Sequence, residues 1–202
     1  AAGIGGIYES LTTSSSDEAF TEYGLIAEII EWPDDRSWVS FTIRKEAYWS
    51  DGKKITADDV VWTFNTLMEK GHPFYGYYYG DVKEVIKEND LKVRFNFITN
   101  TNRELPLIVG QLPVLPKHYW KDKNFEETTL EIPVGSGPYK IKNFDTGRSI
   151  TYELDSNYWG FKNNNVPIKV GKNNFNTIRY DYYKDRGIER EAFKSGEIDF
   201  FS

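Results

Sequence analysis

The sequence has no cysteine, only two histidines among 202 residues, and no apolar run near 18 residues long. Without cysteine there is no disulfide, no thiol nucleophile and no thiolate metal ligand. Two histidines separated by 46 positions do not predict a closed metal site. No stretch is long and apolar enough to span a membrane. We therefore expect no metal centre and no cofactor.

The sequence also has fewer basic than acidic residues. The chain has 25 Lys and Arg against 31 Asp and Glu, a net charge of −6. Phosphate binding needs concentrated basic side chains, and here they are scattered among acids, so we expect no nucleic-acid partner. An apolar content of 39% with 16% aromatic residues is typical of a globular protein with one sizeable core or two small ones.

The sequence motifs of common enzyme sites are missing as well. There is no G-x-x-x-x-G-K-S/T phosphate loop, no H-E-x-x-H and no G-x-S-x-G elbow. The acid pairs Asp34-Asp35 and Asp58-Asp59 are neighbours in sequence, so we expect them to point apart or to cap backbone amides. The sequence predicts no catalytic residue, and we expect that the protein is not an enzyme.

The clearest structural signal lies in residues 37–71. Val39, Phe41 and Ile43 alternate with polar residues, which predicts a strand with one apolar face. Thr56 and Asp59 have the spacing of a capping box, which predicts a helix over residues 57–70. Its apolar stripe consists of Val60, Phe64, Leu67 and Met68, and Gly71 is expected to end it in the left-handed conformation.

Further elements are expected on both sides of this unit. Residues 6–11 predict a short helix or turn, 12–17 a polar loop, 22–30 a helix or strand, and 103–110 a helix. Hairpins are expected from 82–86 with 91–97, and from 139–141 with 150–154. Residues 162–176 predict a long loop. A strand at 178–182, a helix at 187–195 and a strand from Ile198 suggest a parallel crossover unit, and hence an α/β fold.

The densest aromatic cluster follows Gly71 and spans residues 72–80. Its glycines favour a loop. One interpretation is that the rings pack over the preceding helix. The other is a tyrosine platform at the edge of a ligand cleft, where each ring offers apolar area and a hydroxyl. For the lone His118, beside two aromatic residues, we favour packing or solvent exposure over a ligand role.

Several blocks of the sequence resemble one family, in the order expected for it. These are G-I-Y-E-S-L at 6–11, the run S-W-V-S-F-T-I-R with A-Y-W-S-D-G-K-K-I-T-A-D-D-V-V-W-T-F inside 37–64, L-P-V-L-P-K-H-Y-W at 112–120, G-S-G-P-Y-K-I at 135–141, N-Y-W-G at 157–160 and F-K-S-G-E-I-D-F at 193–200. Together they resemble extracellular solute-binding protein family 5, the oligopeptide, dipeptide and nickel receptors of ABC importers. The detail is most similar to the Yej-type subgroup, associated with peptides and the peptide-nucleotide microcin C.

The resemblance implies an α/β, periplasmic-binding-protein-like fold of type II, cluster C. Residues 1–12 and 132–202 would belong to the first lobe, with 13–131 as an inserted small α+β subdomain. The second lobe would be absent, since family members are more than twice this long, so we expect an N-terminal fragment. The implied protein is the periplasmic or extracellular receptor of a peptide importer, monomeric and peripheral to the membrane, with a peptide ligand and permease partners.

Candidate ligand-binding residues follow from the same resemblance. In resembling receptors a tyrosine in the loop after the helix reaches the peptide; Tyr77 is the first choice here, with Tyr75 and Tyr78 as substitutes. The end of the last strand, at Phe201 and Ser202, is expected to border the cleft. The alternative from another class is a carbohydrate-binding or glycan-active domain, because 6 Trp and 14 Tyr would suit sugar stacking. A nickel- or haem-binding relative ranks below peptides.

Overall fold

A computed structural model describes residues 1–15, 17–162, 166, 169 and 171–201. The elements in chain order are the 3-10 helix η1 (Ile4–Ile7), β1 (Thr12–Ser14), β2 (Glu22–Gly24), β3 (Ala27–Glu31), β4 (Trp38–Ile43), α1 (Ala57–Lys70), α2 (Pro73–Tyr78), β5 (Val82–Asn89), β6 (Lys92–Phe97), α3 (Leu105–Gly110), α4 (Lys117–Trp120), β7 (Tyr139–Asp145), β8 (Ser149–Leu154), α5 (Trp159–Lys162), β9 (Thr177–Asp181) and α6 (Arg186–Lys194).

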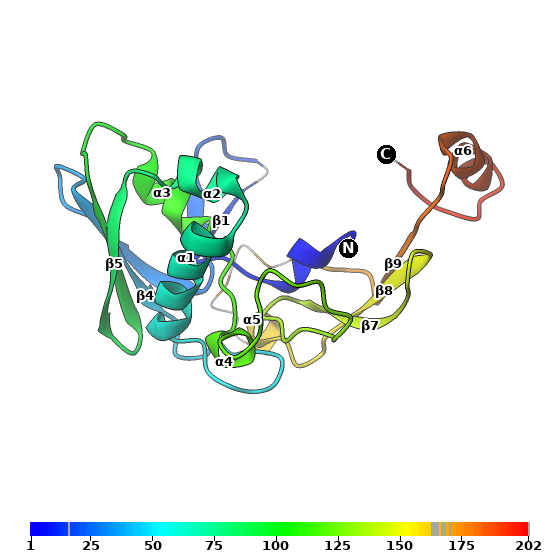
Figure 1. The fold of residues 1–202 in the computed structure, drawn as a ribbon, viewed down its shortest axis with the longest axis horizontal. Coiled ribbons are helices and arrows are strands. Elements are labelled where there is room, and N and C mark those ends of the chain that lie inside the picture. Colours follow the sequence, from blue (N-terminus) through cyan, green and yellow to red (C-terminus); the bar gives the residue numbers. More distant parts are fainter. Residues whose placement is uncertain (16, 163–165, 167–168, 170, 202) are drawn as a thin grey trace.

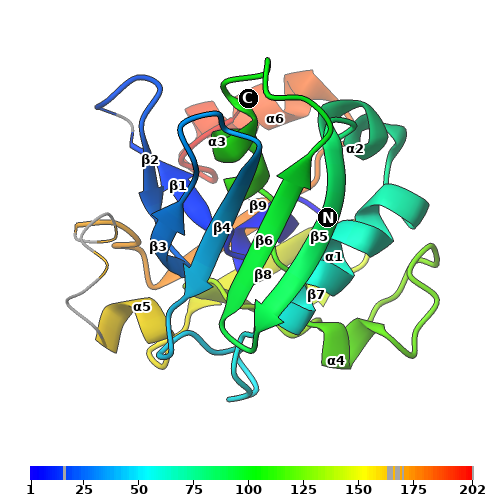
Figure 2. The same cartoon turned by 90° about the vertical axis from the view of Figure 1, so that its left-hand side faces the viewer.

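The larger body is built on an antiparallel sheet of order β3-β4-β6-β5, with α1 against one face (Figures 1 and 2). Alternation places Val39 and Phe41 of β4 and Phe95 of β6 in the core, all fully buried. The opposite face is polar. There Arg94 pairs with Glu88 at 2.5 Å and Lys92 pairs with Glu31 at 2.7 Å. The predicted strand and the 82–97 hairpin are therefore confirmed.

Helix α1 begins as predicted and ends differently. The capping box of Thr56 and Asp59 is present, and Val60, Phe64 and Leu67 are buried. The expectation for Gly71 is wrong, because its φ of −76° is an ordinary extended conformation. The glycine is needed for space instead, since a β-carbon there would lie 2.3 Å from the Leu67 carbonyl oxygen. The extended backbone at this point leads directly into α2.

The smaller sheet has the order β7-β8-β9 and is antiparallel throughout. Its first two strands form the predicted hairpin, with Gly147 at φ +75° in the turn, where a left-handed conformation favours glycine. Ile150 and Tyr152 of β8 pack with Ile7 of η1 in a second apolar cluster. The predicted parallel crossover is wrong for the described residues. The chain after α6 forms no strand up to residue 201, since no neighbouring strand pairs with it there.

Two other expectations change in detail. Residues 12–14, expected within a polar loop, form β1, which pairs with β2. Residues 22–30 hold two strands, β2 and β3, with Leu25 and Ile26 buried between them. Much of the loop expected over residues 162–176 lies outside the described residues. Val166, within it, is buried in the main core.

The two bodies meet where residues 6–11 pass residues 135–137. The amides of Ser136 and Gly137 both donate to the Ile7 carbonyl, at 2.9 and 2.8 Å. A β-carbon at Gly135 would lie 2.5 Å from that oxygen, so the predicted close approach of backbones is confirmed. Leu11 belongs to the larger core and Ile7 to the smaller one. The division into residues 13–131 and the remainder stays a prediction.

Candidate functional site

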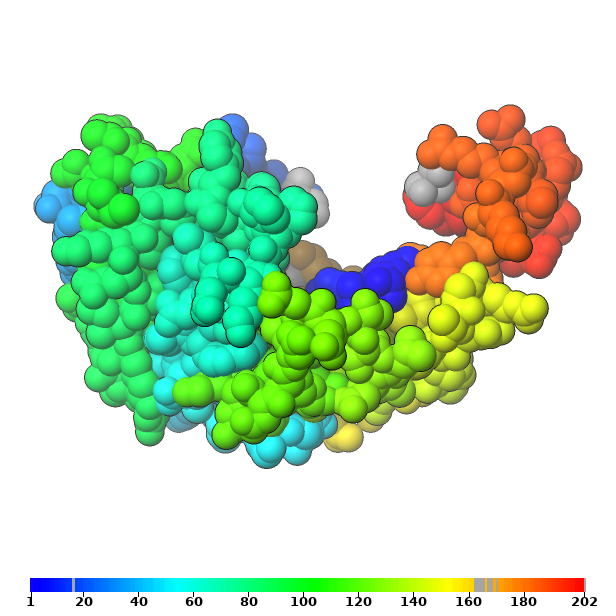
Figure 3. Space-filling model, in the orientation of Figure 1, coloured from blue at the N-terminus to red at the C-terminus, as the bar shows by residue number. Residues whose placement is uncertain are grey.

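The molecule is hollowed between its larger body and the arm formed by β9, α6 and the end of the chain. The space-filling view shows this hollow as a broad opening, with the N-terminal residues in its floor (Figure 3). Helix α2 lies on the wall that belongs to the larger body, and α6 lies across from it (Figure 1). We call this feature the hollow. It lies between the two segments that the sequence nominates for ligand contact.

The predicted tyrosine loop is in fact the short helix α2. The His72 imidazole accepts from the Phe74 amide at 3.2 Å, and Pro73 follows at the first helical position, where its missing N–H costs nothing. The prediction of a loop is therefore wrong. Gly76 occupies a helical position despite its low helix propensity, and no atom lies within 4 Å of where its β-carbon would stand.

Helical spacing sorts the rings of this segment into two groups. Tyr79, just past the end of α2, is 4% exposed and lies edge-on to Phe64 at 6.2 Å; burial raises its pKa. Tyr75 stacks on Tyr79 at 6.1 Å, and Tyr78 stacks on Phe74 at 4.9 Å. Tyr75 and Tyr78 are partly buried against the main core. Core packing therefore accounts for most of these rings.

Tyr77 is different, because 90% of it is exposed. The helix turns it away from the stacked rings that fix α2 against the core. The structure thus separates Tyr77 from its substitutes: Tyr77 is free to meet a ligand, and Tyr75 and Tyr78 are engaged in packing. Its role as a ligand contact stays a prediction.

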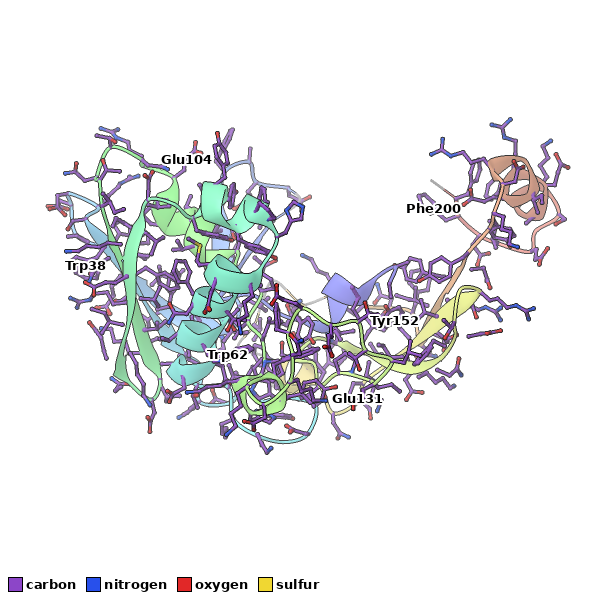
Figure 4. All side chains as sticks on the ribbon, viewed as in Figure 1. Trp38, Trp62, Glu104, Glu131, Tyr152 and Phe200 are labelled. Carbon is purple, nitrogen blue, oxygen red and sulfur yellow. The ribbon has the colours of Figure 1, made fainter. Side chains whose placement is uncertain are left out.

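The second nominated segment lies on the arm. Phe201 is 36% exposed and its ring lies 4.9 Å from that of Phe193 in α6. The side-chain view labels its neighbour Phe200 on the side of the arm that borders the hollow, across from the larger body (Figure 4). Ser202, which was also predicted to contact the ligand, lies outside the described residues.

His118 has a structural partner. Its Nε2 lies 2.8 Å from an Asp51 carboxylate oxygen, and its ring lies edge-on to the buried Trp49 at 6.4 Å. Burial works against ionisation of Asp51, but hydrogen bonds from the Lys53 amide and His118 outweigh it and lower its pKa. Among the described residues there is no group of three or more His, Asp or Glu side chains placed to hold a metal ion.

Sequence reasoning missed a buried polar network at the meeting point of the two bodies. The carboxylate of Glu9, a residue 6% exposed, accepts from the Tyr158 hydroxyl at 2.8 Å and from the Lys169 ammonium at 2.7 Å. The Glu9 amide donates to the Ser136 hydroxyl at 2.8 Å. Burial and the neighbouring carboxylate raise the pKa of Tyr158, so it remains a neutral donor. The only signal in the sequence was an acid inside the otherwise apolar G-I-Y-E-S-L block.

Two pockets are also present. A cavity of about 280 Å³ lies beside the β7–β8 turn and is lined by Ala1, Leu130, Phe144 and Ile150 among others. A shallow one of about 370 Å³ lies at the start of α1 among Lys53, Lys54, Lys117 and Lys121. Neither contains a residue nominated from the sequence.

Two segments that are far apart in the sequence, α2 and the arm that carries α6, thus face each other across the hollow on a mixed α/β scaffold. The chain belongs to the bacterial extracellular solute-binding proteins, family 5, whose model matches residues 21–202. Within the described residues no helix has the length and apolar character needed to cross a membrane.

The chain is similar to two curated proteins of Agrobacterium fabrum: the peptidoglycan-binding protein YepA, 44% identical over 96% of this chain, and the probable peptide-binding protein YejA, 40% identical over 99%. It spans 31% and 33% of their lengths, about one third. The expected Yej-type likeness is confirmed.

The solved structure of the oligopeptide-binding protein AppA from Bacillus subtilis, in complex with a nonapeptide, matches with a TM-score of 0.76. It is 26% identical, and the match covers 96% of this chain and 37% of AppA. The periplasmic-binding-protein-like α/β fold is thereby confirmed.

Proposed function

We propose that this chain is part of the substrate-binding component of an ABC importer, and that the hollow captures an extended peptide, including a peptide-nucleotide, for uptake. The observation that carries the proposal is Tyr77, a tyrosine 90% exposed on α2, the helix that lies on the wall of the hollow (Figure 1) and whose other tyrosines pack against neighbouring rings. A rigid aromatic ring with a hydroxyl can cover an apolar side chain of a peptide and bond its backbone.

Capture in such receptors needs binding groups on both sides of a closing cleft. Here α2 supplies one side, and Phe201 with the end of the chain supplies the other. The proposal includes a periplasmic or extracellular location, a permease as partner, a monomeric state and no catalysis. The family's description as extracellular solute-binding proteins and the peptide-binding relatives support it.

The test is the substitution Tyr77→Ala in the protein at the full length its gene encodes. Peptide binding should weaken by roughly 1–3 kcal/mol, as for an aromatic anchor, while the melting temperature without ligand stays nearly unchanged. Isothermal titration with one peptide pool measures the first and a thermal melt the second. The control is Trp32→Ala, at a ring 48% exposed in the connection between β3 and β4, which Figure 1 shows on the side of the larger body away from α6. Unchanged affinity, or a large loss of stability, would return Tyr77 to a packing role.

A sugar-containing ligand is the second candidate, because the relative that is 44% identical is named for peptidoglycan binding. The strongly exposed rings Phe20, Tyr77, Phe175 and Phe200 come from four separate segments rather than from one strand or helix. That arrangement favours a peptide over a sugar chain stacked on an aromatic row. A binding screen with oligosaccharides beside the peptide pool separates the two: affinity for sugars alone would replace the peptide proposal.

A further inference from the structure

Most of the sixteen glycines are explained by the fold itself. Some adopt a positive φ, which other residues avoid, and at others a β-carbon would come within 3.0 Å of a neighbouring atom. Gly80 is an example of crowding, since its β-carbon would lie 2.9 Å from the Gly76 carbonyl oxygen. Gly5, Gly6 and Gly76 have neither reason. None of the three has a φ in the left-handed region, and no described atom lies within 4 Å of where their β-carbons would stand.

A glycine without a structural reason weakens the element that contains it. Gly76 lies inside α2, and Gly5 and Gly6 lie inside η1. Glycine loses more conformational freedom on folding than alanine does, and it is the poorer helix former. All three positions are exposed, so a methyl group there would project into open space. The sequence therefore holds glycine at three places where alanine would fit the fold and stabilise it.

The three glycines belong to the two elements that border the hollow on its floor and on one wall. The N-terminal residues, which include η1, lie in the floor (Figure 3), and α2 lies on the wall of the larger body (Figure 1). Gly6 and Gly76 are separated by 70 positions in the sequence. The glycines that the fold does not explain are thus brought together by tertiary folding at one feature of the surface.

On α2, the glycine lies beside the residue already proposed to contact the ligand. Pro73, Gly76 and Tyr77 share one face at helical spacing, and Tyr77 carries the only long side chain among them. The rings of Tyr75 and Tyr78 stack on neighbouring rings instead. The exposed ring of Tyr77 therefore has bare helix backbone next to it, which leaves room for a second chain.

We propose that the main chain of the ligand lies against the bare backbone of Gly76 and of Gly5 and Gly6, so that these glycines are ligand-contacting residues of the hollow; the inference rests on the proposed function. A glycine lets another chain approach its backbone closely, because no β-carbon stands between them. At Gly76 the ligand's main chain reaches the helix while one of its side chains meets the ring of Tyr77. At Gly5 and Gly6 the same extended chain follows the floor.

The experiment uses the protein at the full length its gene encodes. The variants are Gly76→Ala, Gly76→Leu and the double substitution Gly5→Ala/Gly6→Ala. Alanine and leucine both favour helices, so the series at position 76 adds bulk without weakening α2. The control is Asn65→Ala, which improves helix propensity at an exposed position of α1, outside η1 and α2. Thermal melts without ligand measure stability, and isothermal titration with one pool of alanine-based pentapeptides measures affinity.

Gly76→Ala should weaken peptide binding about tenfold, and Gly76→Leu more strongly, because each added atom takes space that the ligand occupies. Gly5→Ala/Gly6→Ala should weaken it by a similar factor. The melting temperature of both Gly76 variants should be unchanged or about 1–2 °C higher, since glycine is the poorer helix former. Asn65→Ala should keep the parent's affinity. A loss of affinity without a loss of stability distinguishes a ligand contact from a glycine that the fold needs.

Unchanged affinity in the glycine variants would overturn the inference and leave the peptide proposal standing. So would a fall in melting temperature that accompanies the loss of affinity, because the fold would then need these glycines. An equal loss of affinity in Asn65→Ala would also overturn it. If only one of the two elements responded, the ligand would not follow both, and the inference would be wrong as stated. Binding of no peptide by the parent protein would overturn the proposed function itself.

Discussion

Phe64 is the aromatic residue that ties three elements together. Its ring lies edge-on to Phe95 of β6 at 5.8 Å and to Tyr79 after α2 at 6.2 Å. Through these contacts α1 is joined to the sheet below it and to the segment that carries Tyr77. Edge-on pairs add stabilisation beyond the area they bury. A single side chain thus links the core to the wall of the hollow.

We expect Phe64→Ala to lower the free energy of unfolding by roughly 3–5 kcal/mol, because it leaves a cavity in a packed core. Trp62→Ala should cost less, since Trp62 is only partly buried and contacts Phe125 at 6.2 Å. Denaturant melts of both variants measure the difference. Equal losses would mean that α1 depends on packing around its whole circumference.

For single residues, the apolar pattern predicted which side chains are buried, and the aromatic cluster at residues 72–80 did not. Alternation and the helical stripe identified Val39, Phe41, Val60 and Phe64 as core residues, because each period places them on one face. Tyr77 and Tyr79 could not be told apart, because six of the nine residues from 72 to 80 are aromatic or proline and mask any period. The helix that His72 and Pro73 initiate separates them.

The start of α1 shows how one element uses two adjacent acids in opposite ways. Burial raises the pKa of Asp59, which caps Thr56 and accepts from the Lys117 amide at 2.9 Å. The hydrogen bond from Lys87, at 2.5 Å, lowers the pKa of Asp58, with help from the charge of Lys117. Because burial makes the pKa of Asp59 higher in the folded protein than in the unfolded chain, its contribution to stability is present below the unfolded-state pKa. That contribution is lost as pH rises through the folded-state pKa.

Asp58 acts in the other direction. Its pKa in the folded protein lies below the ordinary 3.8, so its contribution is present above that value and is lost as pH falls through the folded-state pKa. Asp58→Asn should therefore flatten the loss of thermal stability below about pH 4. Melting temperatures between pH 2.5 and 6 would show this, with Asp122→Asn, at a carboxylate 84% exposed, as control. If the melting temperature of Asp58→Asn fell at low pH as steeply as that of the parent protein, the ion pair of Lys87 with Asp58 would make no contribution to stability.

Elements with strong local signals were predictable, and those that depend on distant partners were not. The capping box set the start of α1, and the apolar alternation in β6 set the hairpin with β5. The short strands β1 and β2 have little apolar alternation and owe their existence to pairing with each other. The strand expected at Ile198 failed for the converse reason: its pattern was suitable, and no described strand lies beside it.

Across the whole molecule, the two bodies are joined by backbone contacts that small residues permit and by one buried polar network. Residues 135–137 were predicted to come close to another backbone, because glycine on both sides of Ser136 leaves room. That their partner would be Ile7, and that Glu9 would bind Lys169 across 160 positions, depends on tertiary folding alone. The candidate site was predictable only in part, because it too depends on tertiary folding. The sequence predicted Tyr77 as a ligand contact, and the hollow bordered by α2 results from how the two bodies are arranged.

The buried pair of Glu9 and Lys169 is expected to hold the two bodies in this arrangement. The side chains of Lys169 and Glu9 are 14% and 8% exposed, so removal of the cation leaves a carboxylate buried without its partner. Lys169→Met should therefore cost roughly 3–5 kcal/mol of unfolding free energy. Tyr158→Phe, which removes one hydrogen bond to the same carboxylate, should cost roughly 1.5–3 kcal/mol.

Glu9→Gln together with Lys169→Met should be less damaging than Lys169→Met alone, since the double variant buries no unpaired charge. Urea unfolding followed by tryptophan fluorescence measures the parent protein, the two single variants and the double variant. Lys172→Met, at an exposed lysine nearby in sequence, is the control for the loss of a surface charge. If Lys169→Met cost no more than Lys172→Met, the ion pair would contribute little, and the junction would depend on the contacts of Ile7 with Ser136 and Gly137 instead.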